Sequence, residues 1–191
     1  MRSILKVFAE LFLKKRPAGG TDKSKFENLE DIMATIKIIT VGTLKEDYLK
    51  DAVTEYEKRI SGFCKVESVN LKEAKLPQDP SDGEIKRALA EEAKAILANM
   101  PDRSYKIAMC VEGKQFSSEE LATKIEGAFS YANEICFVIG SSHGLDDNVK
   151  NAADLRLSVS KLTFPHQLMR VVLLESIYRC LNIIKGTKYH K

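Results

Sequence analysis

An apolar hexapeptide, ICFVIG at residues 135–140, constrains the fold more than any other segment of this chain. Its side chains are hydrophobic without alternation up to the closing glycine. A strand that faces water on one side alternates apolar and polar residues, whereas a strand of a parallel sheet that is covered on both faces is apolar throughout. The hexapeptide therefore predicts a central strand of a sheet with helices on both faces.

Strand-like and helix-like periodicity alternate from residue 33 to the end of the chain. The other predicted strands are residues 35–42, 65–71, 105–113 and, more weakly, 155–160. The predicted helices are residues 44–60, 81–100, 117–132 and 166–184. Ser81 with Glu84, and Ser117 with Glu120, have the spacing of a capping box, which marks the start of two of these helices. The alternation predicts an α/β fold with a mainly parallel sheet.

The first 32 residues differ in character from the rest of the chain. MRSILKVFAELFLKK can form a short amphipathic helix, and RPAGGTDKSK is typical of a linker. We expect a boundary near Met33, with residues 1–32 as a dispensable or flexible extension and residues 33–191 as the domain. The alternatives are an interaction or membrane-surface helix and a targeting segment, although Lys6 and Glu10 interrupt the apolar centre that a secretory signal needs.

Composition narrows the classes of function. No run approaches the roughly 18 uninterrupted apolar residues of a membrane span, so we expect a cytoplasmic protein that does not cross a membrane. The four cysteines form no CxxC pair and there is no HExxH motif, so we expect neither disulfides nor a metal site. The formal net charge of +3 is too small to prove a polyanionic partner, and it leaves nucleic acid open.

Glycine ends three of the predicted strands, at Gly42, Gly113 and Gly140. Each alone can be a simple turn, but in parallel sheets ligands lie beyond the carboxyl ends of the strands, so the three together favour a site there. The segment IGSSHGLD around Gly140 has neither GxGxxG nor GxxxxGK[ST] spacing, which argues against dinucleotide and P-loop sites. His143 within it is a base, a phosphate contact or merely a solvated loop residue.

A polar loop, SKLTFP, is joined directly to the most hydrophobic predicted helix. Its hydroxyls, its main-chain amides and the Phe164 ring can hold a purine and a ribose. Pro165 suits a helix start, and His166 then lies at the positive end of the helix. An ordinary loop and helix start fits the same pattern. Arg170 lies among apolar residues of this helix and needs a partner.

The chain ends in Tyr189, His190 and Lys191. Such tails are commonly frayed. These side chains can also orient a base, assist proton transfer or contact phosphate.

Three blocks of the sequence, in this order, resemble the bacterial 23S rRNA pseudouridine-N3 methyltransferases, a family of the SPOUT class. The blocks are IKIITVGTLKEDYLKDAVTEYEKRI, then FVIGSSHGL with LSVSKLTFPHQLMRVVLLESIYR, and the closing YHK. The resemblance covers residues 33–191. Any single block is weak evidence, whereas the combination is specific.

The resemblance implies a C-terminal trefoil knot, a rare exception to un-knotted topology. It implies that S-adenosylmethionine binds in the knot, among three loops. The residues that it assigns to the cofactor are Met109, Gly140, Val159, Ser160, Lys161, Leu162, Thr163 and Phe164. It also implies a homodimer in which the tail of one subunit completes the active site of the other.

The resemblance further implies the reaction, which is methyl transfer to N3 of a pseudouridine in 23S rRNA of the large subunit or the 70S ribosome. The sulfonium is already reactive, so alignment of the reactants and removal of the N3 proton are the tasks of the protein. We expect Tyr189 and His190 to orient the base and assist proton loss, with His166 as a second candidate. We expect Lys191 and Arg170 to contact RNA.

One segment departs from the family pattern. After Gly140 the family usually has a second glycine, a small residue and an acid or asparagine, whereas Ser-Ser-His stands at residues 141–143. Gly140 and Gly144 remain, so the cofactor assignment is kept. Other hypotheses are a SPOUT methyltransferase with another RNA target, which the YHK ending argues against, a non-catalytic ribosome-binding or assembly module of the same fold, and a flavodoxin-like enzyme acting on a small nucleotide.

Overall fold

The structure is a computed structural model of the 191-residue chain, and it describes residues 34–187 and Tyr189. The extension expected at residues 1–32, and with it the boundary near Met33, lies outside the described residues and stays a prediction. His190 and Lys191 also lie outside them.

The described chain alternates strands and helices, as the sequence predicts. The strands are β1 (Thr35–Val41), β2 (Lys65–Leu71), β3 (Tyr105–Lys114), β4 (Glu134–Ile139) and β5 (Leu155–Leu157). The helices are α2 (Asp47–Ser61), α3 (Asp82–Asn99), α4 (Ser118–Phe129), α5 (Asp147–Ala152) and α6 (His166–Lys185). All strands pair in parallel in the order β2-β1-β4-β3-β5, which confirms the predicted α/β class.

Four elements differ from the sequence pattern: α2 begins three residues later than predicted, α4 ends three residues earlier, and the other two are α5 and β5. The short helix α5 is not predicted, because its six residues bury only Val149 and are too few to show a period. β5 ends at Leu157, three residues earlier than predicted, and residues 158–165 form a loop. The differences at α5 and β5 lie at the carboxyl ends of β3, β4 and β5. The trefoil knot implied by the resemblance stays a prediction.

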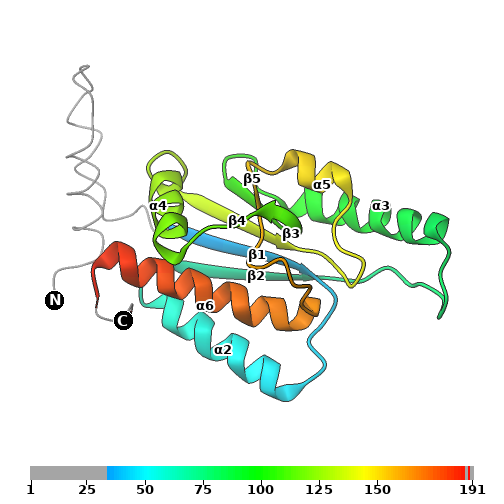
Figure 1. Ribbon diagram of the computed structural model, residues 1–191, viewed down its shortest axis with the longest axis horizontal. Coiled ribbons are helices and arrows are strands. Elements are labelled where there is room, and N and C mark those ends of the chain that lie inside the picture. The colour runs from blue at the N-terminus through cyan, green and yellow to red at the C-terminus, as the bar shows by residue number, and fades with distance from the viewer. Residues whose placement is uncertain (1–33, 188, 190–191) are drawn as a thin grey trace.

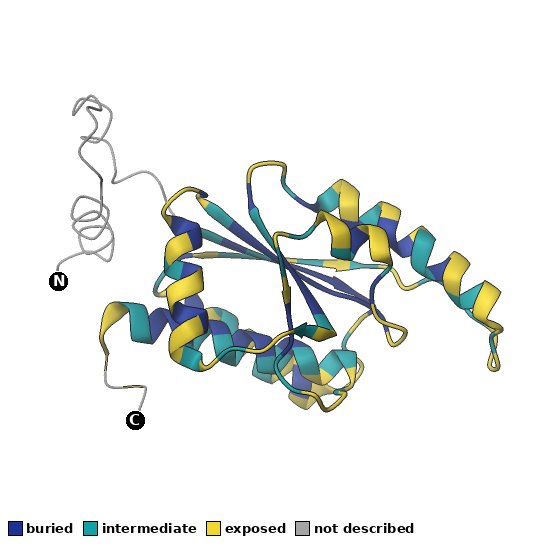
Figure 2. Ribbon diagram, turned by 45° about the horizontal axis from the view of Figure 1, so that its top comes forward, coloured by how far each residue is buried: buried dark blue, intermediate teal, exposed yellow. Residues whose placement is uncertain are grey.

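Helices cover both faces of the sheet (Figure 1). One core lies between the sheet and α2, α4 and α6, and contains Ile38 and Phe137. The other lies between the sheet and α3 and α5, and contains Ile39 and Val138. Figure 2 shows the buried strands between these helical layers. Because both faces are covered, residues 135–139 are all buried, as their continuous apolar pattern predicts.

Helix starts fix where the loops at the carboxyl edge of the sheet end. Ser81 and Ser117 both form the predicted capping boxes, with their hydroxyls accepting from the main-chain N–H of Glu84 and Glu120. α6 begins at His166 directly after Pro165 and has no side-chain cap. This helix packs against both α2 and α4 and buries seven of its residues. A deeply packed helix therefore anchors the loop that precedes it.

Among the described residues, we find no helix whose length and hydrophobicity would let it span a bilayer.

Candidate active site

A cleft of about 690 Å³ opens at the carboxyl ends of β3, β4 and β5. Most of its lining comes from three segments, which are residues 109–112, 139–145 and 157–169. Parallel sheets place their ligands at this edge, and small-molecule sites commonly enclose about 300–1,000 Å³. The fold therefore offers one cleft of suitable size where the sequence predicts a site.

Most of the residues predicted to bind the cofactor lie around this cleft. Those that line it are Met109, Gly140, Val159, Ser160, Leu162, Thr163 and Phe164. Lys161 is exposed and is not among the lining residues. His166, a candidate for proton transfer, also lines the cleft. The structure brings these residues together, while their roles in binding and catalysis stay predictions.

In the turn after β4, the main chain of Gly140 packs directly against the main chain of Gly144. A Cβ atom on Gly140 would stand 1.9 Å from the carbonyl oxygen of Gly144, so only glycine fits at this position. The Gly144 N–H donates to the carbonyl oxygen of Ser141 at 3.0 Å, and Gly144 has a φ of +88°. Ser142 and His143 are exposed at the tip of the turn. The unusual Ser-Ser-His segment is thus compatible with a closed glycine turn.

The loop between β5 and α6 is shaped by its own serines. The Ser158 hydroxyl donates to the carbonyl oxygen of Ser160 at 2.8 Å, and the Ser160 hydroxyl accepts from the Leu162 N–H at 3.0 Å. The Ser158 N–H donates to the Lys114 carbonyl oxygen at 3.0 Å, which ties the loop to the end of β3. Leu162 lines the cleft yet is 71% exposed. One wall of the cleft is thus an apolar side chain that a ligand can cover.

An ion pair stands at the rim of the cleft. Lys150 Nζ lies 2.7 Å from Glu112 Oε1, and both residues line the cleft. The sequence pattern predicts neither of them. Glu112 follows the buried part of β3. Its position at the carboxyl end of a parallel strand could have identified it as a site residue, because ligands bind at that end. Lys150 carried no such signal, since it belongs to the unpredicted α5.

The first turns of α6 meet the end of β1 at a buried arginine. Arg170 is 5% exposed, and its Nη2 donates to the carbonyl oxygens of Val41 at 2.9 Å and Gly42 at 2.8 Å. Its Nη1 donates to Asn70 Oδ1 at 2.9 Å, and its Nε has no hydrogen-bond partner among the described residues. The partner that this interior arginine requires is therefore a set of uncharged oxygens of its own chain.

Burial also affects His166, one turn before Arg170. Desolvation lowers the pKa of the imidazole, an effect that the nearby Glu73 carboxylate opposes. A histidine with a lowered pKa is mostly neutral at pH 7. The His166 ring can therefore accept a proton at the edge of the cleft.

Replacing Arg170 with methionine will lower the free energy of unfolding by about 2–4 kcal/mol, because it leaves two buried carbonyl oxygens without donors. Arg87→Met is the matched control, since Arg87 is exposed on α3 and should change stability by less than about 0.5 kcal/mol. Urea unfolding measures both variants. Equal midpoints for the two would contradict a structural role for the Arg170 hydrogen bonds.

The C-terminal Tyr189 lies away from the cleft of its own chain. The centroid of its ring lies 4.8 Å from the centroid of the Tyr178 ring, and the Arg179 guanidinium carbon lies 5.2 Å from the centroid of the Tyr189 ring. Tyr178 follows His166 by about three helical turns, which is about 18 Å along the axis of α6. The structure therefore does not bring Tyr189 together with His166 within one chain.

Known methyltransferases are similar to most of this chain. Residues 34–190 match the family described as "Predicted SPOUT methyltransferase". A Streptococcus thermophilus protein named ribosomal RNA large subunit methyltransferase H is 49% identical over 82% of the chain and 99% of its own length. A Methanococcus maripaludis protein with the same name, marked putative, is 47% identical over the same shares. A solved probable methylase family protein from Haemophilus influenzae has 15% identity and a TM-score of 0.48, covering 82% of the chain and 70% of its own.

Proposed function

The chain belongs to the SPOUT methyltransferases, within the family of ribosomal RNA large subunit methyltransferase H, and on that premise we propose that it methylates N3 of a pseudouridine in 23S rRNA, with S-adenosylmethionine as donor. The observation that carries the proposal is the cleft at the carboxyl ends of β3, β4 and β5. Seven of the eight residues that the resemblance assigns to the donor line it. A ribosomal substrate would place the reaction in the cytoplasm.

The residues of the cleft fit an adenosine with an amino-acid tail. Met109, Leu157 and Val159 offer apolar surface to a flat ring system, and Ser160 and Thr163 offer hydroxyls. The Gly140 turn leaves main chain rather than a side chain against the ligand. When bound, S-adenosylmethionine supplies an electrophilic sulfonium methyl group. The protein then has to hold the target nitrogen in line with that methyl group and remove its proton.

The position of Tyr189 supports a homodimer with a shared active site. The Tyr189 ring packs on Tyr178, which lies about 18 Å along α6 from His166. Within one chain, Tyr189 therefore lies far from the end of α6 that lines the cleft. In the proposed dimer, Tyr189 and His190 of one subunit orient the base over the cleft of the other, His166 accepts the N3 proton, and Lys191 contacts RNA phosphate. Arg170 was expected to contact RNA, but its guanidinium is buried and donates to oxygens of its own chain, so its proposed role is to hold Gly42 in place.

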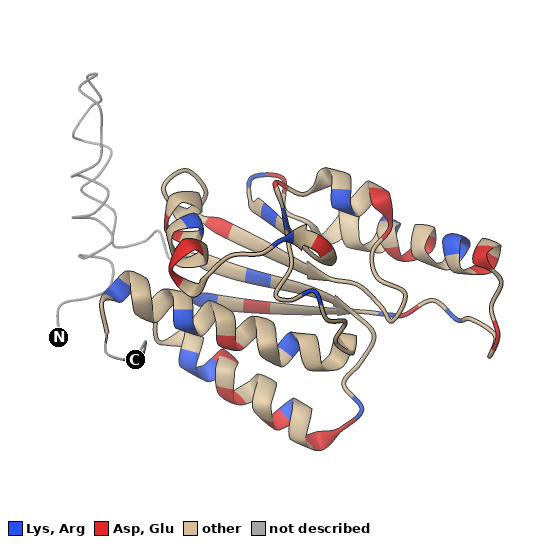
Figure 3. Cartoon of the chain, in the orientation of Figure 1, with Lys and Arg blue, Asp and Glu red and all other residues tan. Residues whose placement is uncertain are grey.

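The charge distribution supports an assembled ribosome as substrate. The net charge is +3, and both α2 and α3 carry acidic and basic side chains together (Figure 3). Affinity for bare RNA depends on the number of neutralised phosphates, so this surface should hold free RNA weakly. A ribosome offers contacts beyond one RNA loop.

Labelled S-adenosylmethionine and ribosomes that lack the modification test the proposal. The purified protein should place label in 23S rRNA, and ribosomes that already carry the methyl group should accept none. Ribosome binding without any transfer would instead support the non-catalytic assembly module. Label in another RNA would support a SPOUT enzyme with a different target.

A further inference from the structure

Three polar side chains from distant parts of the chain converge above Gly42, beside the cleft. A Cβ atom on Gly42 would stand 3.3 Å from Glu73 Oε2, 3.6 Å from His166 Nε2 and 3.9 Å from Arg170 Nη2. Gly42 has a φ of +86°, a conformation that L side chains rarely adopt. The glycine therefore keeps open a small space bounded by a carboxylate, an imidazole and a guanidinium.

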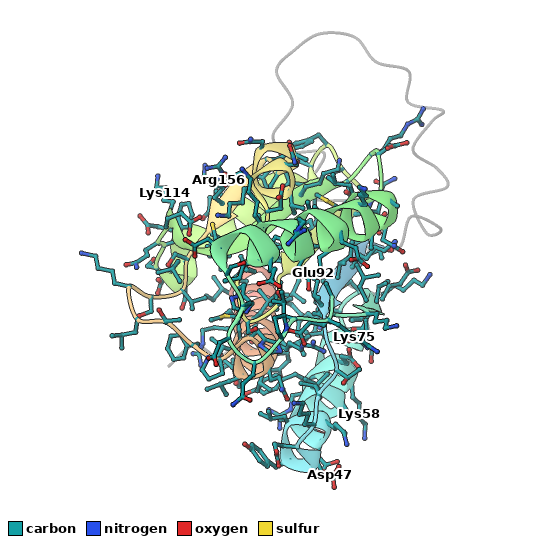
Figure 4. The ribbon with its side chains drawn as sticks, turned by 90° about the vertical axis from the view of Figure 1, so that its right-hand side faces the viewer. Asp47, Lys58, Lys75, Glu92, Lys114 and Arg156 are labelled. Atoms are coloured by element: carbon teal, nitrogen blue, oxygen red, sulfur yellow. The ribbon has the colours of Figure 1, made fainter. Side chains whose placement is uncertain are left out.

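The loop that follows β2 carries Glu73 into this position, and two contacts hold it. The N–H of the next residue, Ala74, donates to Oε1 of Glu92 at 3.0 Å, and Glu92 is 5% exposed on α3. Figure 4 labels Glu92 on α3 and Lys75 in the same loop. The Ser142 hydroxyl donates to Glu73 Oε1 at 3.5 Å. The Glu73 carboxylate is thus tied to the turn of the cofactor cleft.

This carboxylate is available to a ligand. Glu73 is exposed, and it forms no ion pair within 4.0 Å in the part of the chain that the structure describes. An ionised carboxylate only accepts hydrogen bonds, and a charge-assisted hydrogen bond is roughly twice as strong as a neutral one. Its natural ligand group is an N–H or O–H donor on a molecule that reaches the cleft.

We propose that Glu73 distinguishes pseudouridine from uridine by accepting a hydrogen bond from N1–H of the target base. This inference rests on the proposed function. In pseudouridine the sugar is bonded to C5, so N1 carries a hydrogen, whereas in uridine N1 carries the sugar and has none. A site with an acceptor for this group favours the base that can donate to it.

The positions of the two ring nitrogens fit this arrangement. N1 and N3 flank the C2 carbonyl group of the base and point in different directions. A base that is held at N1 by Glu73 can therefore turn N3 toward the cleft, where His166 is placed to accept its proton. Glu73 acts on the choice of substrate, and His166 acts on the reacting nitrogen.

The experiment compares Glu73→Gln with wild-type enzyme on two kinds of ribosome, which carry either pseudouridine or uridine at the target position. Rate constants are measured in single turnovers with enzyme in excess. We expect Glu73→Gln to lower the rate constant on pseudouridine about 5–10-fold, because the amide oxygen still accepts the hydrogen bond but without the help of a charge, and to leave the rate constant on uridine unchanged. Asp79→Asn, in the same loop, is the matched control and should behave as wild type.

Two further readouts separate recognition from a structural role. The affinity for S-adenosylmethionine should be the same in wild type, Glu73→Gln and Asp79→Asn. The preference for pseudouridine over uridine ribosomes in a binding competition should fall in Glu73→Gln alone.

Two results would overturn the inference. One is a full rate on pseudouridine with Glu73→Gln, and the other is an equal loss on both substrates with an unchanged competition ratio. Failure of the proposed function is distinct, because wild-type enzyme would then methylate neither kind of ribosome.

Discussion

A Gly140→Ala enzyme will bind S-adenosylmethionine at least about 100-fold more weakly than wild type and will lose measurable methyl transfer. The added methyl group would stand 1.9 Å from the Gly144 carbonyl oxygen, 2.5 Å from its carbonyl carbon and 3.0 Å from Leu145 Cδ2. Two of these three atoms belong to the main chain, so no side-chain rotation relieves the overlap. The turn between β4 and α5 must open, and it forms one wall of the cleft.

Gly127→Ala is the matched control for this substitution. Gly127 lies inside α4, and a Cβ atom there meets nothing within 4 Å. Alanine in a helix interior stabilises by about 0.5–1 kcal/mol relative to glycine. The control should therefore be slightly more stable than wild type and bind S-adenosylmethionine equally well.

Titration calorimetry measures cofactor affinity, and thermal unfolding shows whether each variant is folded. Normal affinity in Gly140→Ala would show that the cofactor binds elsewhere. Leu162→Ser tests the same cleft without a change in the turn, because Leu162 is largely exposed and lines the cleft. It should weaken binding with unchanged stability, and unchanged affinity in this variant would contradict the assignment even if Gly140→Ala does not fold.

Deleting Tyr189–Lys191 will abolish methyl transfer while the fold and the affinity for S-adenosylmethionine remain. Of the deleted residues, the structure describes Tyr189, which is exposed and belongs to neither buried core. In the proposed dimer they act over the cleft of the partner subunit. Label transfer to ribosomes and cofactor titration measure the two properties. A truncated enzyme with full activity would rule out a catalytic role for the tail.

Mixed dimers test whether the tail acts on the other subunit. One subunit carries Gly140→Ala and an intact tail, and the other carries an intact cleft and lacks Tyr189–Lys191. Neither homodimer should be active, whereas the mixed dimer contains one complete site. Random pairing of equal amounts makes half of the dimers mixed, so about a quarter of the wild-type activity should return. If the Gly140→Ala subunits are folded and the mixed dimers show no methyl transfer, the tail does not act on the cleft of the other subunit.

Local patterns predict those features whose energy comes from neighbours along the chain. The continuous apolar run at residues 135–139 is buried on both faces, and the capping boxes at Ser81 and Ser117 begin their helices as predicted. The polar loop before His166 is anchored to a buried helix, as the junction of loop and apolar helix indicates. In each case burial or a cap is encoded in the spacing of adjacent side chains.

The spacing of adjacent side chains does not encode short helices or contacts between exposed side chains. The helix α5 is too short to show a period, so Lys150 and its ion pair with Glu112 are absent from the predicted site. Glu73 lies in a polar, proline-bearing loop whose sequence gives no sign of a position beside the cleft. Its neighbours are known only once the loop is placed against the turn after β4.

Periodicity and glycine positions were enough to predict the order of the strands and the four long helices, the parallel α/β class and the sheet edge at which the cleft opens, because they report local burial and turns. Which side chains meet at that edge depends on the folded chain. Arg170 bonds to carbonyl oxygens of residues that lie 128 and 129 positions earlier in the chain, and Gly42 separates Glu73 from His166. Such contacts exist only after the sheet has formed, so no local pattern of residues encodes them.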